Sequence, residues 1–114
     1  METLSIQSNK RFALALIKEL LSRHWRVDTS TNDTLVVHSE DTRAYIYPDT
    51  ESKSLDLFTL FIDYSDVELA KALLQQIADD SDLIVDNDFG TILTGSDFVA
   101  RCKTDPDWDW RSKS

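Results

Sequence analysis

The first long amphipathic pattern in the chain begins at Ser8. Apolar side chains recur there at spacings of three and four residues, whereas Lys18 and Glu19 fall on the opposite side of a helical projection. The apolar positions are Phe12, Ala13, Leu16, Ile17, Leu20 and Leu21. This spacing predicts an amphipathic helix over residues 8–23, and either Ser8 or Asn9 has a side chain suited to capping its first turn.

The pattern then changes from helical spacing to alternation. Residues 25–29 alternate apolar or β-branched side chains with charged ones, and residues 34–38 and 43–47 are rich in β-branched and aromatic side chains. Pro48 stops the third of these strands. Residues 55–64 are apolar on both faces for most of their length, which is typical of a strand in the middle of a sheet. The four segments predict an antiparallel meander.

A second helix is expected over residues 66–78. Ser65 followed by Glu68 matches a capping box, and the apolar residues behind them recur at helical spacing. Three carboxylates crowd the C-terminus of this helix, where the negative end of the helix dipole disfavours each by roughly a few tenths of a kcal/mol. They are Asp79, Asp80 and Asp82. Residues placed against local stability suggest a functional role.

The last third of the chain predicts a hairpin and a short helix. Residues 83–93 have the pattern of two short strands around a polar turn, in which Asn87 and Gly90 supply the turn conformations. Residues 94–97 open a short helix that cannot continue through Pro106. These elements complete the set expected from the sequence.

Together the patterns predict a single α+β domain over residues 1–114. Only two glycines and two prolines interrupt the chain, too few for an internal linker. We expect an antiparallel sheet, made of the four-strand meander and the short hairpin, packed against the N-terminal helix and the helix over 66–78, with a short C-terminal helix. The expected core includes Trp25, Val27, Ile46, Phe61 and Leu74.

The charge of the chain is strongly negative and unevenly spread. Twelve Lys and Arg stand against 21 Asp and Glu, which gives a net charge of −9. Residues 1–26 carry a net +3, so residues 27–114 carry −12. This balance excludes a conventional nucleic-acid binder, because binding to phosphates needs a basic face. It fits a basic protein partner, although acidic surfaces also serve solubility alone.

Nothing in the sequence predicts export or a membrane span. No apolar run approaches the roughly eighteen residues that a span needs, and residues 1–7 lack the basic and apolar regions of a signal peptide. The expected location is the cytoplasm. Cys102 is the one cysteine, which excludes an internal disulfide and a cysteine metal cluster. Its apolar neighbours predict a buried free thiol.

No catalytic or metal-binding motif emerges from the reactive residues. Asp86, Asp88 and Asp97 faintly echo a calcium-binding EF-hand loop, but the glycine falls one position early and the final glutamate is missing. An Asp-Phe-Gly triplet in the same turn lacks the other elements of a protein kinase. His24 and His38 lie at the ends of a predicted helix and strand, where structural histidines are common. We therefore expect no enzyme activity, no metal and no cofactor.

Two tryptophans near the C-terminus leave two interpretations open. In an extended segment, Trp108 and Trp110 face one way and Asp107 and Asp109 the other. The indoles either anchor a partner, since Trp is favoured at binding hot spots, or fold back onto the domain. The candidate partner-binding residues are Asp79, Asp80, Asp82, Asp86, Asp88, Asp105, Asp107, Trp108, Asp109 and Trp110. We expect them to converge on one surface; the alternative contact surface is the strand face that bears Tyr45 and Tyr47.

Four features of the chain have a counterpart in a known class of proteins: the N-terminal helix, WRVD at 25–28, RAYIYP at 43–48 and IVDNDFGTILTGSDFV at 84–99. In these features the chain resembles the small acidic α/β immunity proteins of bacterial polymorphic-toxin and contact-dependent growth inhibition systems. The resemblance implies that the protein binds the toxic C-terminal domain of a secreted effector, often a basic nuclease, and occludes its active site. The alternative is an acidic nucleic-acid mimic or adaptor that binds another basic protein.

Overall fold

Seven antiparallel strands and three helices make up the part of the chain that the computed structural model describes, residues 1–30, 33–50 and 57–111. The strands are β1 (Glu2–Ser8), β2 (Arg26–Thr29), β3 (Leu35–Ser39), β4 (Thr42–Pro48), β5 (Phe58–Tyr64), β6 (Ile84–Asp86) and β7 (Ile92–Thr94). The helices are α1 (Leu14–Leu21), α2 (Val67–Ile77) and α3 (Gly95–Thr104). The expected α+β class is therefore confirmed.

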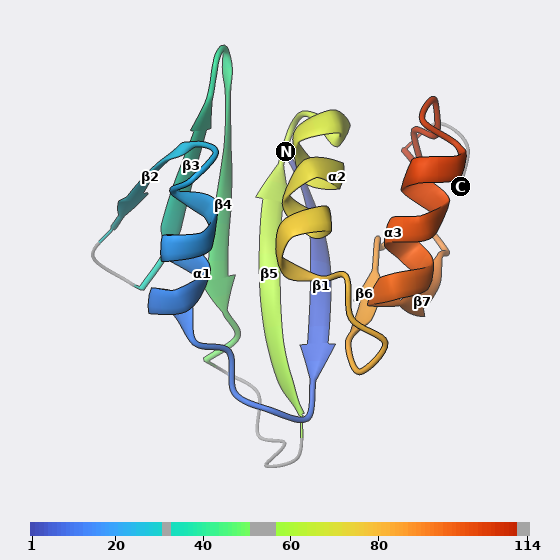
Figure 1. Cartoon of the computed structure of the whole chain (residues 1–114), viewed down its shortest axis with the longest axis horizontal. Coiled ribbons are helices and arrows are strands. Elements are labelled where there is room, and N and C mark those ends of the chain that lie inside the picture. Colours follow the sequence, from blue (N-terminus) through green and yellow to red (C-terminus); the bar gives the residue numbers. More distant parts are fainter. Residues whose placement is uncertain (31–32, 51–56, 112–114) are drawn as a thin grey trace.

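The strands form one sheet in the order β2-β3-β4-β5-β1-β6-β7. β2 to β5 are the predicted meander, and β6 and β7 are the predicted hairpin. β5 is the middle strand, as its apolar sequence indicated, although residues 55 and 56 of the expected strand lie outside the described residues. β1 is inserted between β5 and β6 and joins the meander to the hairpin (Figure 1). The sheet is therefore larger than expected.

The expectation of a helix over residues 8–23 was wrong for its first half, because β1 and a connecting segment come first. The helix begins only at Leu14, after Ala13, which makes no capping bond through its side chain. Ser8 ends β1, and its hydroxyl oxygen accepts a hydrogen bond from the amide of Lys10 (3.0 Å). β1 pairs with β5 over seven positions and with β6 over three. This pairing with distant segments decides its conformation.

All three helices lie on one face of the sheet (Figure 1). The pleat sends alternate side chains to opposite faces, and those that face the helices, such as Leu4 and Ile6 of β1 and Leu60 and Ile62 of β5, are fully buried. The outward side chains of the same strands are half-buried or exposed. Across the described ranges, no further layer covers this second face, which we call the open face.

The five predicted core residues divide into three groups. Ile46 and Leu74 are fully buried. Trp25 and Val27 are partly buried and pack against the edge of the core. Phe61 was predicted wrongly, because it lies on the open face. β5 is apolar on both faces, so its sequence alone does not tell which alternate set points inward.

Side-chain caps fix the starts of the two later helices. In α2 the cap is Asp66 rather than the predicted Ser65, and its carboxylate accepts a hydrogen bond from the amide of Glu68 (3.0 Å). α3 begins where the sequence predicted, and the hydroxyl oxygen of Thr94 accepts a hydrogen bond from the amide of Asp97 (3.2 Å). These caps satisfy amides of the first turn that have no partner within the helix.

Candidate functional site

The ten predicted partner-binding residues lie in three places rather than one. The first group is Asp79, Asp80 and Asp82, the second is Asp86 and Asp88, and the third is Asp105, Asp107, Trp108, Asp109 and Trp110. The first group lies beside the start of α3, because the amide of Ser96 donates to the carbonyl of Asp80 (3.3 Å). The third group follows the other end of α3, whose ten residues span about 15 Å. The structure does not gather the ten on one surface (Figure 1).

The three aspartates between α2 and β6 are exposed and have a structural explanation. A carboxylate oxygen of Asp80 accepts a hydrogen bond from the amide of Asp82 (2.8 Å), which tightens the turn. The positive end of the α3 dipole lies beside this turn and opposes the negative end of the α2 dipole. The aspartates are therefore not placed against local stability, contrary to the sequence-based interpretation.

The turn between β6 and β7 is held by its own side chains. Asp86 accepts a hydrogen bond from the amide of Asp88 (2.9 Å), and the fully buried Asn87 accepts bonds from the amides of Phe89 (2.8 Å) and Thr91 (3.1 Å). Positive φ angles occur at Asp88 (63°) and Gly90 (98°). The predicted turn conformation is therefore present at Gly90, whereas Asn87 does not have a left-handed backbone. No group of metal-ligating side chains was found among the residues that the structure describes.

Trp108 and Trp110 fold back onto the domain. They are 3% and 0% exposed, and the ring of Phe98 packs against both, at centroid distances of 5.2 and 5.5 Å. The indole of Trp110 donates a hydrogen bond to the hydroxyl of Tyr64. The guanidinium carbon of Arg101 lies 3.8 Å from the centroid of the Trp108 ring. Both indoles therefore belong to the core, and neither offers an exposed ring to a partner.

A buried lysine, which the sequence analysis did not single out, holds the same C-terminal segment. The ammonium of Lys71 in α2 donates to the carbonyl of Pro106 (3.0 Å) and to the carboxylate of Glu68 (3.2 Å). Asp109 accepts from the guanidinium of Arg111 (3.2 Å), and this hydrogen bond lowers the pKa of Asp109. The remaining carboxylates of this segment are exposed; they belong to Asp105 and Asp107.

The open face brings aromatic and carboxylate groups together around Asp63 of β5. One carboxylate oxygen, Oδ1, accepts hydrogen bonds from the hydroxyl of Thr3 (2.6 Å) and from the phenol of Tyr47 (3.1 Å). Tyr45 lies directly opposite Asp63 in the register of β4 and β5. The ring of Phe61 lies 5.5 Å from that of Tyr47, centroid to centroid. Burial and the nearby carboxylate raise the pKa of Tyr47.

Charge on the open face is negative along its β5-β1-β6 part. The sequences of β1, β5, β6 and β7 contain no lysine or arginine. Asp86 of β6 lies opposite Ser5 of β1. A hollow of about 150 Å³ opens nearby, and the side chains lining it include Asp86, Asp88 and Phe61. Of the ten predicted partner-binding residues, Asp86 and Asp88 are therefore the two that border the open face.

At the other side of the open face, around β2, positive and negative groups lie side by side. Asp28 forms a hydrogen bond with the ring of His38 (2.8 Å) and an ion pair with Arg26 (3.2 Å). The hydrogen bond to His38 is the main cause that lowers the pKa of Asp28. Arg43 lies opposite His38 in the next strand and is exposed. This corner therefore offers a partner both signs of charge.

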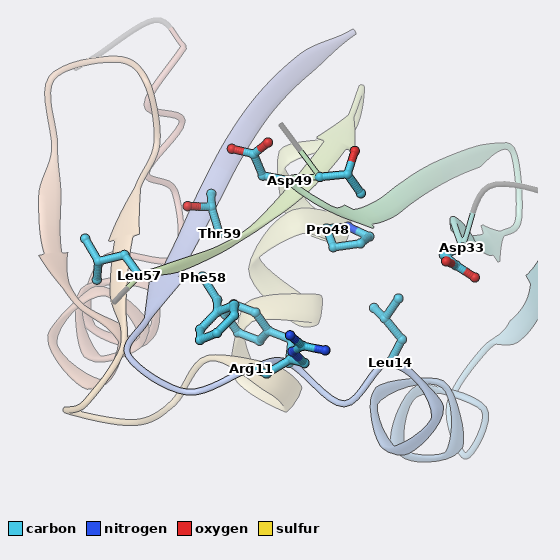
Figure 2. Close-up of a pocket in the computed structure, with 10 residues that line it drawn as sticks. Arg11, Leu14, Asp33, Pro48, Asp49, Leu57, Phe58 and Thr59 are labelled. Atoms are coloured by element: carbon cyan, nitrogen blue, oxygen red, sulfur yellow. The ribbon is translucent and has the colours of Figure 1, made fainter. Parts of the chain in front are cut away.

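A cavity of about 410 Å³ lies where β4 ends and β5 begins (Figure 2). Phe58 and Leu14 contribute apolar surface, and the guanidinium carbon of Arg11 lies 5.6 Å from the centroid of the Phe58 ring. Asp33 and Asp49 add two carboxylates at the rim. One cation and two anions around an apolar floor are ordinary for a protein surface and favour no single class of ligand.

Cys102 is a buried free thiol, as expected from the sequence. Burial raises the pKa of this thiol to about 11. The thiol is therefore protonated at neutral pH, whereas a nucleophilic cysteine needs its thiolate form. Its side chain is one of the buried groups by which α3 contributes to the core.

Comparisons with protein-family models, with curated proteins and with solved structures found no match to this chain. Among the described residues, no helix has the length and apolar character needed to cross a bilayer. The geometry of the open face is therefore the main guide to function.

Proposed function

We propose that this protein is an immunity protein that binds the toxin domain of a secreted effector and blocks its active site. The observation that carries this proposal is the open face, where Tyr45, Tyr47 and Phe61 surround Asp63 and remain half-buried. Tyrosine and other aromatic side chains are enriched in protein interfaces. The carboxylates on the same face are complementary to a basic partner. A nuclease is the toxin class that best matches this chemistry.

The inhibition follows from competition for positive charge. A nuclease presents lysine and arginine around the cleft that binds the phosphate backbone. The acidic face occupies the same positive potential, so inhibitor and nucleic acid exclude each other. The net charge of −9 accelerates encounter, and buried aromatic contacts slow dissociation. In this mechanism the inhibitor itself performs no catalysis and contacts no nucleic acid. We propose the cytoplasm, where a nuclease toxin meets its substrate, as the place of action.

The proposal expects an effector to be encoded next to this protein's gene, and the test is co-expression with the C-terminal domain of that effector. We expect cells that make the toxin domain alone to stop growing and cells that make both proteins to grow. The purified pair should form a complex without nuclease activity. Growth arrest in both cultures, with both proteins folded and present, contradicts the proposal. A stable complex with a non-toxic DNA-binding protein instead favours the acidic mimic or adaptor.

Ionic strength tests the electrostatic part of the mechanism. The Debye length shrinks from about 10 Å at 0.1 M salt to about 3 Å at 1 M. We expect the association rate constant of the complex to fall over this range and the dissociation rate constant to change less. An association rate that does not respond to salt removes electrostatic steering from the mechanism, whereas the occlusion itself is tested by the growth assay.

A further inference from the structure

We infer that Asp63 is the residue of the open face that receives a lysine or arginine side chain of the partner. The inference rests on the proposed binding of a basic protein and adds the point of contact. Asp63 lies on β5, the middle strand of the sheet. Asp63 is the last residue but one of β5, but three strands lie on each side of β5, so this residue is far from both edge strands of the sheet. Binding energy concentrates at contacts that are shielded from water, away from the rim of an interface.

The carboxylate of Asp63 is already oriented for such a contact. Thr3 on one neighbouring strand and Tyr47 on the other both donate to Oδ1, at 2.6 and 3.1 Å. Within the described parts of the chain, no hydrogen bond or ion pair engages the second oxygen, Oδ2. Both donors are neutral, so the negative charge is not cancelled. A group held in its binding conformation loses less entropy when the partner arrives.

The surroundings of Asp63 favour a cation with a long apolar stem. Tyr45 is the cross-strand neighbour of Asp63, and Phe61 is the next outward residue of the same strand. Such rings attract a guanidinium or ammonium over their faces, and they pack against the methylene groups of lysine and arginine. An arginine side chain fits this combination of ring faces and one carboxylate particularly well.

The charges that share the open face agree with this assignment. Arg43 is the one cation on β4, and it lies two residues before Tyr45, toward the corner that Arg26 and His38 share with Asp28. On the other side, beyond β1, the second outward carboxylate belongs to Asp86. Strand spacings place Asp63 and Asp86 about 12 Å apart. A partner with two basic residues at this spacing meets both carboxylates at once.

The first experiment titrates the ¹⁵N-labelled full chain with a hexa-arginine peptide and follows the amide signals by NMR. We expect saturable shifts centred on Thr3, Tyr45 and Asp63. Shifts that are instead centred on residues 79–82, or on the segment after α3, overturn the inference. This result does not depend on any variant protein.

The second experiment compares two variants that remove the same charge. Asp63→Asn and Asp107→Asn each change the net charge from −9 to −8, so long-range attraction for the peptide is equal in both. We expect the peptide's Kd to rise about fivefold or more for Asp63→Asn and less than about twofold for Asp107→Asn. The asparagine keeps an oxygen acceptor for Thr3 and Tyr47, and the NMR spectrum itself reports folding. Equal changes in Kd overturn the inference.

A third variant, Tyr47→Phe, keeps the ring and the net charge and removes one donor to Asp63. We expect the Kd for the peptide to rise about two- to threefold, because the carboxylate is less well oriented. An unchanged Kd overturns the orienting role of Tyr47. These tests need no toxin. Shifts at Asp63 without neutralisation of a toxin would sink the proposed function alone, whereas neutralisation that Asp63→Asn leaves intact would sink this inference alone.

Discussion

Trp110 donates a hydrogen bond from its indole to the hydroxyl of Tyr64 and so ties the C-terminal segment to the middle strand of the sheet. The two rings meet edge to face, with centroids 5.9 Å apart and an interplanar angle of 76°. Both side chains are fully buried. The two tryptophans therefore anchor the segment that follows α3 to the core, whereas Asp105 and Asp107 of the same segment are exposed.

Replacing Trp110 with alanine tests this contribution to the core. We expect the free energy of unfolding to fall by about 3–5 kcal/mol, as for other large buried aromatic side chains. Trp25→Ala is the control, because Trp25 is only partly buried and should cost clearly less. Urea denaturation followed by circular dichroism measures both. A loss for Trp110→Ala that does not exceed the loss for Trp25→Ala contradicts the structure.

Lys71→Met tests the polar link between α2 and the C-terminal segment. Lys71 is 3% exposed, and its replacement leaves the carbonyl of Pro106 without this donor. We expect the free energy of unfolding to fall by about 1–3 kcal/mol. Hydrogen exchange should become faster over residues 105–111. The control, Glu68→Gln, removes a carboxylate that is 72% exposed, and it should change stability by less than about 0.5 kcal/mol. Similar exchange rates in both variants would mean that Lys71 does not hold the segment.

Gly95→Ala tests the close approach between α3 and the end of α2. An added Cβ would lie 1.9 Å from the carbonyl oxygen of Ala78 and 2.7 Å from that of Asp80, which are backbone atoms. We expect the free energy of unfolding to fall by about 3 kcal/mol or more. Gly90→Ala is the comparison, because open space surrounds Gly90 and only its φ of 98° opposes the change, at about 1–2 kcal/mol. Thermal unfolding should rank the two variants in this order.

Alkaline pH should destabilise the protein through Cys102. Its pKa is raised from 9.0 to about 11 by burial, so the unfolded chain loses the thiol proton at a lower pH than the folded chain. Stability from this group is complete below about pH 9 and declines as the pH rises toward 11. Cys102→Ala should flatten the decline of the urea midpoint over this range. The pKa values of Tyr47 and Tyr64 are also raised, so some decline above pH 10 should remain. An identical slope in wild type and variant contradicts the assignment.

The elements that the sequence predicted correctly are those defined by local patterns. The hairpin over 83–93 combines two short apolar runs with a polar turn, so the signal for pairing β6 with β7 lies in residues that are close in sequence. β1 was missed because its conformation depends on distant partners: Leu4, for example, lies opposite Ile62. Alternation was visible in residues 2–8, where Leu4 and Ile6 are separated by polar side chains. This short signal would have supported a strand.

The candidate site was predicted only in part for a related reason. Tyr45 and Tyr47 were placed on one face from the sequence, because their spacing of two decides this. Asp63 was not singled out, since its hydrogen-bond partners come from two other strands. A sequence signal did exist: a lone aspartate between apolar residues at the end of a central strand indicates that one face of that strand is uncovered. The density of aspartates along the chain instead favoured the loop after α2 and the C-terminal segment as the binding surface.

Replacing Asp79, Asp80 and Asp82 together by asparagine separates long-range charge from direct contact. Stability should change by less than about 0.5 kcal/mol, because an asparagine oxygen can still accept from the amide of residue 82 and the adjacent α3 dipole opposes that of α2. The net charge changes from −9 to −6, so association with the basic partner should slow. Dissociation should stay nearly constant, since this loop lies beside α3 and not on the open face.

Asp63→Asn should show the opposite behaviour, with faster dissociation and a nearly unchanged association rate. Rate constants measured by surface plasmon resonance at two salt concentrations distinguish the two. If the triple variant speeds dissociation more than Asp63→Asn, the contact surface includes the loop, and the placement first expected from the sequence is correct.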